Sequence, residues 1–194
     1  MPRQPTPQDL RVAFEVFSRT LTGSFALYAW KMQLLPRLLP YREEIGPYIA
    51  VGQDAAVQSS LVCIRSLDDF FLSPDEVHFD HDVLAHDFGF AQIGSPLGIP
   101  ERTRINRMIV HMSYAPLWTA SAYVGPSGDG SFDLPALLTR VVQRSMVFLD
   151  YCATAPLFAG ADDLRKVSGL KRLAECQLTN VQAIGQLERS LPNR

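Results

Sequence analysis

Two arginines and a histidine recur at helical spacing in the stretch ERTRINRMIVHMSYAPLW, residues 101–118. At about 100° per residue, Arg104, Arg107 and His111 fall within about 60° of one another around a helix axis. A histidine that titrates near neutrality beside a permanently charged guanidinium can act as acid, base or phosphate ligand. This is the chemistry of an RNA-cleaving or nucleotide-binding site. A second interpretation stays open, in which the arginines are solvated and the histidine rests against a neighbouring carboxylate.

Carboxylates that could orient this histidine lie in the helix predicted before it. Residues 60–71 read SLVCIRSLDDFF, a mostly apolar helix interrupted by charges. One interpretation pairs Arg65 with Asp68 and Asp69 within the helix, at spacings of three and four residues, as a solvated ion pair. The other places one of the two carboxylates across from His111, where it would orient the imidazole and raise its pKa.

The order of these motifs resembles a group of small bacterial helical proteins akin to the HEPN superfamily. The resemblance covers roughly residues 50–118 and consists of a core helix ending IRSLDDFF, a variable loop, and a helix reading RINRMIVHMSY. Nuclease members carry an arginine, four to six residues, then a histidine, and Arg104 and His111 fit with six residues between them. Asn106 is a polar residue within this motif, whereas Arg107 does not fit as its arginine. The resemblance implies metal-independent RNA cleavage at a dimer interface or, in relatives that have lost activity, nucleotide binding alone.

An acidic, histidine-rich stretch between the two helices is a candidate for metal binding. Imidazole and carboxylate ligands suit zinc, iron or manganese. The stretch lacks HExxH and the paired Glu-x-x-His motifs of di-iron bundles, because the third residue after Glu76 is Phe79. The sequence therefore favours a solvated loop without a metal, and a metal-binding bundle is the weaker alternative. The candidate ligands are Asp75, His78, Asp80, His81, Asp82, His86 and Asp87.

Net charge and cysteine content indicate which partners and which compartment to expect for the protein. A formal net charge of −2 gives no overall attraction to a phosphate backbone, so a nucleic-acid role requires a local basic site. The cysteines, Cys63, Cys152 and Cys176, are odd in number and far apart, which favours free thiols in a reducing compartment. No apolar window reaches the roughly 20 residues of a membrane span, and the first residues lack the apolar core of a signal peptide. We expect a cytoplasmic protein without a membrane segment.

Apolar periodicity of three to four residues predicts helices along most of the chain. Thr6, Pro7 and Asp9 mark the first helix as its N-cap, first position and first-turn acid. Pro36 and Pro40 are expected to interrupt the second helix. The narrow apolar stripe of the last helix suits either a seam between two copies or packing within its own bundle. The predicted helices span residues 7–21, 25–35, 48–72, 101–114, 133–152 and 162–191, with a possible short helix at 80–86.

These elements predict one all-α domain over residues 1–194, a bundle of five or six helices. We expect an RNA-binding or RNA-cleaving homodimer without a cofactor, in a defence or toxin–antitoxin setting with an antitoxin-type partner. His111 would act as general base or acid, and Arg104 would stabilise charge developing on phosphate. The alternative is a non-catalytic helical protein whose Arg/His stripe is an ion-paired surface or a dimer seam. The supporting residues are Arg65, Asp68, Asp69, Asn106 and Arg107.

Overall fold

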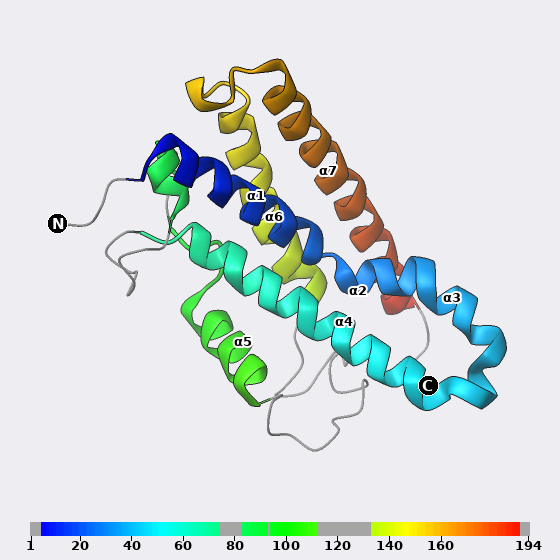
Figure 1. The fold of residues 1–194 in the computed structure, drawn as a ribbon. Coiled ribbons are helices and arrows are strands. Elements are labelled where there is room, and N and C mark those ends of the chain that lie inside the picture. The colour runs from blue at the N-terminus through cyan, green and yellow to red at the C-terminus, as the bar shows by residue number, and fades with distance from the viewer. Residues whose placement is uncertain (1–4, 74–82, 93, 112–132, 191–194) are drawn as a thin grey trace.

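The computed structural model describes residues 5–73, 83–92, 94–111 and 133–190, and it confirms the all-α fold (Figure 1). The long helices are α1 (Pro7–Gly23), α4 (Arg42–Phe70), α5 (Ile99–His111), α6 (Leu134–Cys152) and α7 (Ala161–Ser190). The shorter elements are α2 (Ala26–Ala29), a π-helical turn η1 (Trp30–Leu34), α3 (Leu35–Leu38), and the 3-10 turns η2 (Leu39–Tyr41), η4 (Ala85–Phe88) and η6 (Pro156–Phe158). The helix α4 is central, because α1, α2, α5 and α6 all pack against it. The helix α7 packs on α6 and α1.

Side-chain caps fix two of the helix starts that the sequence predicts. The Thr6 hydroxyl accepts a hydrogen bond from the Asp9 backbone N–H at 3.2 Å, and the Asp9 carboxylate accepts one from the Thr6 N–H at 2.8 Å. This reciprocal pair satisfies two N–H groups that a helix start leaves without a partner. Asp133 caps α6 with a single hydrogen bond, which its side chain accepts from the Ala136 N–H at 2.9 Å.

The second and third predicted helices differ from the structure at their junction. Pro36 and Pro40 do not break the chain out of helical geometry, because each lies in the first turn of a new short element, where no N–H is required. The third helix begins at Arg42 rather than at residue 48 and includes Pro47. Glu43 and Glu44 favour this earlier start, since acids in the first turn meet the positive end of the helix dipole.

The connection after α4 also departs from expectation. The short helix expected at residues 80–86 is a 3-10 turn at Ala85–Phe88, and residues 80–82 lie outside the described part of the chain. Gly89, with φ of 85°, ends this turn in the left-handed region that favours glycine. The Arg/His helix begins at Ile99 and is described as far as His111.

A cluster of phenylalanine rings forms the centre of the core. Phe148 of α6 is fully buried, and its ring centroid lies 5.0 Å from that of Phe17 and 5.1 Å from that of Phe70. Phe88 and Phe90, from the connection before α5, approach the same ring at 5.3 and 5.4 Å. Aromatic pairs at such distances contribute about 0.5–1.5 kcal/mol beyond the area they bury. The cluster therefore ties α1, α4, α6 and this connection together.

The apolar stripe of α7 packs within its own bundle. Val167, Ala174, Leu178 and Val181 are buried, and the helix lies against α6 and α1. Of the two uses predicted for this stripe, the structure therefore supports packing within the bundle rather than a seam between copies. Among the described helices, none combines the length and the apolar character that crossing a membrane requires.

Candidate functional site

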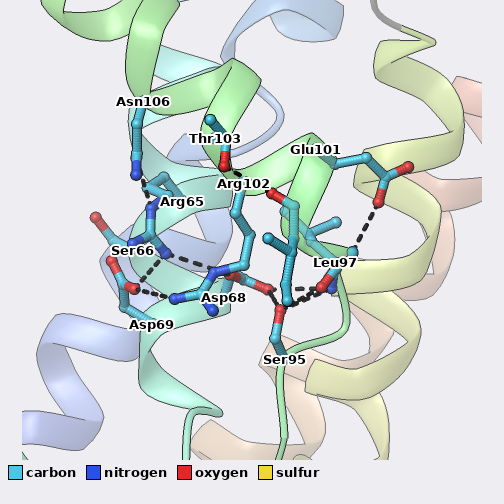
Figure 2. A network of polar contacts seen from close by, with 12 residues as sticks. Arg65, Ser66, Asp68, Asp69, Ser95, Leu97, Glu101, Arg102, Thr103 and Asn106 are labelled. Atoms are coloured by element: carbon cyan, nitrogen blue, oxygen red, sulfur yellow. Dashed lines mark hydrogen bonds and ion pairs between the residues drawn. The ribbon is translucent and has the colours of Figure 1, made fainter. Parts of the chain in front are cut away.

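The motif residues Arg104, Arg107 and His111 belong to α5, but their side chains lie outside the described part of the structure. The backbone of α5 packs against α4, as the sequence interpretation requires. The supporting residues Arg65, Asp68, Asp69 and Asn106 are described, and Figure 2 shows them gathered between the two helices. The candidate site is therefore built from these residues and their neighbours.

Asp68 is the centre of the polar network and its side chain is completely buried. Its Oδ1 accepts hydrogen bonds from the Ser95 hydroxyl at 2.5 Å and from the Leu97 N–H at 3.1 Å. Its Oδ2 accepts a hydrogen bond from Arg65 Nη1 at 3.2 Å and lies 3.0 Å from Arg102 Nε as an ion pair. Three donors and one further cation therefore surround the carboxylate, although Arg102 Nε itself makes no hydrogen bond to a described residue.

Asp69 and Asn106 extend the network toward solvent. Arg65 Nη1 donates to Asp69 Oδ1, and Arg102 Nη2 lies 3.6 Å from the same oxygen. Arg65 Nε donates to the Asn106 side-chain oxygen at 2.7 Å, which joins α4 to α5. The predicted intrahelical pairing of Arg65 with both aspartates is therefore present. It is not solvated as expected, because Asp68 is buried and the Arg65 side chain is only 18% exposed.

Burial sets the electrostatics of the two aspartates. Desolvation raises the pKa of Asp68, and the hydrogen bonds from Ser95 and Leu97 and the charges of Arg102 and Arg65 oppose that rise. Desolvation also raises the pKa of Asp69, against the charge of Arg65. Two guanidinium groups face two carboxylates here, so the network in its ionised form carries no net charge.

The connection between α4 and α5 delivers the donors that Asp68 needs. Gly94 has φ of 111°, and its N–H donates to the Phe71 carbonyl at 2.6 Å, which returns the chain to the end of α4. Ser95 then lies beside Asp68, and the Leu97 N–H also donates to the Ser95 hydroxyl oxygen at 3.0 Å. The first turn of α5 follows at once and supplies Arg102. The loop thus provides two of the four partners of Asp68, and the start of α5 provides a third.

A second ion pair connects the start of α5 to α6. Glu101 accepts from Arg140 Nη2 at 2.5 Å and from the Gly98 N–H at 2.8 Å. The hydrogen bond from Arg140 lowers the pKa of Glu101 below its usual value. Both side chains of this pair are partly exposed, and the pair links α5 to α6 without burying a charge. Together the two ion-pair groups hold the first half of α5 on both of its flanks.

The predicted metal stretch falls mostly on residues outside the described part of the chain, including His78 and His81. Within the described residues, no group of three or more histidine, cysteine, aspartate or glutamate side chains could hold a metal ion. His86 is largely exposed and lies 3.9 Å from Asp87 between Nδ1 and Oδ1. The Asp87 carboxylate is also used to accept from the Leu84 N–H at 2.8 Å, which caps the η4 turn.

The cysteines are free thiols, as predicted. Burial raises the pKa of Cys152 to about 12, and it also raises the pKa of Cys63. A thiol with a raised pKa is a poor nucleophile at neutral pH. These two residues therefore belong to the packing of the bundle.

Sequence reasoning missed Arg102, Ser95, Leu97 and Arg140. Arg102 and Asn106 are four residues apart and so share a helix face, which is a signal that the sequence did contain. Ser95 and Leu97 contact Asp68 across 27 and 29 residues, and no local spacing predicts such contacts. The burial of Asp68 likewise depends on which segments pack over it.

This arrangement can clamp α5 to α4, because both oxygens of Asp68 accept hydrogen bonds and both guanidinium groups form ion pairs with it. A carboxylate that is paired on both oxygens is poorly suited to transfer protons. Asp68 instead holds α5, the helix that carries Arg104 and His111. Comparison with models of known protein families, with curated proteins and with solved structures found no match to this chain. Its function is therefore inferred from the residues of the site.

Proposed function

We propose that this chain is a HEPN-like helical protein of the cytoplasm that binds or cleaves RNA, with Arg104 and His111 as its site. One observation supports the proposal above the others: α5 is anchored to α4 through Arg102 and Asn106, which lie on one side of the helix. At about 100° per residue, positions 104, 107 and 111 lie roughly 140–200° around the axis from Arg102. The motif positions are therefore on the side of α5 opposite to the anchor.

The residues of the site have distinct roles in this proposal. His111 serves as general base or acid toward a ribose hydroxyl or the leaving oxygen, and Arg104 stabilises the charge that develops on the phosphate. Arg107 adds positive charge for the RNA backbone, which the overall charge of −2 does not supply. Asp68, Asp69, Arg65 and Asn106 position α5 as a whole.

The test is an RNA cleavage and binding assay in the presence of a chelator. His111→Ala should lower cleavage by about 100-fold to 10,000-fold, the range for a lost general acid–base group, and Arg104→Ala by about 100-fold to 1,000-fold, the range for a lost group that stabilises transition-state charge. Their melting temperatures should change little. The matched control is Arg172→Ala, which removes an exposed arginine of α7 and should leave the cleavage rate unchanged.

The cellular setting can be tested separately. A defence or toxin–antitoxin role predicts that expression of the wild-type chain slows growth, that His111→Ala relieves this effect, and that an antitoxin-type protein co-purifies with the chain. Growth that is equal for the wild type and the variant would contradict this setting without affecting cleavage in the purified system.

A second candidate function follows from the completeness of the network. All the charges of Arg65, Arg102, Asp68 and Asp69 are satisfied internally, which is typical of a structural connection in a non-catalytic interaction protein. This candidate predicts that His111→Ala lowers stability by roughly 1–3 kcal/mol, as the loss of a buried hydrogen-bonded side chain does. It also predicts that the purified wild type neither cleaves nor binds RNA. That pair of results would replace the RNA proposal.

A further inference from the structure

Residues 30–51 form a helical hairpin in which no residue is buried, although the segment is rich in large apolar side chains. We call this segment, which comprises η1, α3, η2 and the first part of α4, the hairpin tip. In α4 the first buried residue is Val57, so the first half of this 29-residue helix contributes no fully buried residue to the core. Tyr48 is 75% exposed and Val51 is 58% exposed. The other exposed large apolar residues of the hairpin tip are Met32, Leu34, Leu39 and Tyr41.

The hairpin tip has a defined packing of its own. Its elements contact one another and α2, and Figure 1 shows α3 and the start of α4 projecting beyond the ends of α6 and α7. The Trp30 ring lies so close to Gly52 that a Cβ there would be 2.3 Å from a ring atom. The segment is therefore a preformed structure with an uncovered apolar surface. Large exposed apolar side chains gathered in one segment are typical of an interaction site.

Unpaired charges of both signs accompany this apolar surface. Arg37, Arg42, Glu43 and Glu44 are exposed, and none of them forms an ion pair with any residue that the structure describes. Two of the four are cationic and two are anionic, so the set is neutral. In a two-fold contact a surface meets its own copy, and a set of charges with both signs can then pair with itself.

We propose that the hairpin tip is the contact through which two copies of this chain associate. Each copy covers the Leu39, Tyr48 and Val51 surface of the other, and the arginines of each hairpin tip face the glutamates of its partner. The charge pattern favours a second copy over an anionic lipid surface, because Glu43 and Glu44 would be repelled by the lipid headgroups that attract Arg37 and Arg42. This inference does not rest on the RNA proposal, since it uses a different part of the molecule.

The first experiment measures the mass of the full chain by light scattering and sedimentation over a range of concentrations. The wild type is expected to be a dimer, and Leu39→Asp with Val51→Asp is expected to raise the dimer dissociation constant at least about tenfold while the helical circular dichroism is unchanged. The matched control is Val12→Asp with Val16→Asp, because these valines of α1 are 54% and 57% exposed. The control should remain a dimer.

The second experiment exchanges charges across the contact. A variant with Arg37→Glu and Arg42→Glu should not self-associate, and neither should one with Glu43→Arg and Glu44→Arg, because like charges would face each other. Mixed in equal amounts, the two variants should form a mixed dimer. Melting curves of both variants confirm that each is folded.

Three results would overturn the proposal. The first is a wild type that stays monomeric at high concentration. The second is a dimer that survives the hairpin substitutions but is lost in the α1 control. The third is a monomer that floats with vesicles of phosphatidylserine and phosphatidylcholine and is released by Leu39→Asp with Val51→Asp, which would assign the surface to a membrane.

Discussion

The two halves of α4 have opposite environments within a single helix. From Val57 onward the helix buries Leu61, Ile64 and Leu67, and it carries the enclosed carboxylate of Asp68. From Arg42 to Ala56 no residue is buried as a whole, and the charged residues Arg42, Glu43 and Glu44 are without described partners. The backbone is equally helical in both halves. Helix formation in α4 therefore does not require burial along its whole length, and the packing of other elements decides where the stabilisation lies.

The difference extends to the polar residues of the two halves. Asp54, in the exposed half, has a buried Oδ1 without a hydrogen-bond partner among the described residues, whereas each oxygen of Asp68 is paired. Burial raises the pKa of both. Only Asp68 has cations and donors that oppose the rise, because only its half of α4 faces α5 and the connection before α5.

The largest expected effect is the loss of the Asp68 carboxylate. Asp68→Ala should lower the free energy of unfolding by about 3–5 kcal/mol, because Arg65 and Arg102 would remain partly buried without their central anion. Glu44→Ala in the exposed half should cost less than about 1 kcal/mol, which is the scale of a helix-dipole contribution. Urea denaturation followed by circular dichroism measures both values. Equal losses would mean that the two halves of α4 do not differ in their electrostatic contribution.

Truncation of apolar side chains should separate the two halves next. Ile64→Ala should cost about 2–5 kcal/mol, because Ile64 is fully buried and its truncation leaves a cavity. Val51→Ala should change stability by less than about 0.5 kcal/mol in the monomer. Both variants are compared by chemical denaturation at low protein concentration, where association through the hairpin tip does not contribute. A large loss in Val51→Ala under these conditions would show that the exposed half has a covered apolar face.

Two glycines of α4 sharpen the comparison within the exposed half. Gly52→Ala should destabilise the protein by about 1–3 kcal/mol, because the new Cβ would meet the Trp30 ring at 2.3 Å. Gly46→Ala should instead stabilise it by up to about 1 kcal/mol, since no atom of the described residues lies within 4 Å of the new Cβ and alanine favours a helix. Thermal unfolding monitored by circular dichroism gives both signs. A stabilising Gly52→Ala would show that the ring does not pack on this helix.

The smallest expected effect is in the pH dependence of stability. Because burial raises the pKa of Asp54, the stability this group contributes is complete below its unfolded value of about 3.9 and is lost as pH rises through its folded pKa. In Asp54→Asn the free energy of unfolding should therefore fall less than in the wild type as pH rises above about 4. Asp68→Asn should remove the corresponding decline but lower stability at neutral pH, because it also loses the ion pairs with Arg65 and Arg102. Unfolding free energies measured from pH 3 to pH 7 test this prediction. A steeper decline in Asp54→Asn than in the wild type would show that ionisation of Asp54 stabilises the fold, contrary to the prediction.

The sequence predicts the helical content and most helix positions because these depend on local spacing. Thr6 with Asp9, and Asp133 with the residues that follow it, are complete capping signals within four residues of chain. The pairing of Arg65 with Asp68 and Asp69 also follows from spacing on one helix. Pro36 and Pro40 misled the prediction, because each lies in the first turn of a short element, where the N–H that a proline lacks is not required.

Only the tertiary structure decided what surrounds these residues. The helical spacing of residues is the same along the whole of α4. It gives no reason for Asp68 to be enclosed and for Tyr48 to be exposed. That outcome depends on Ser95, Leu97 and Arg102, which reach Asp68 from segments distant in sequence. Desolvation and its compensation are properties of all the atoms around a group, whereas capping and helical spacing involve only its neighbours along the chain. The sequence by itself therefore determined the helices and their intrahelical pairs, and the packing between helices decided which charges are buried and which surfaces are left uncovered.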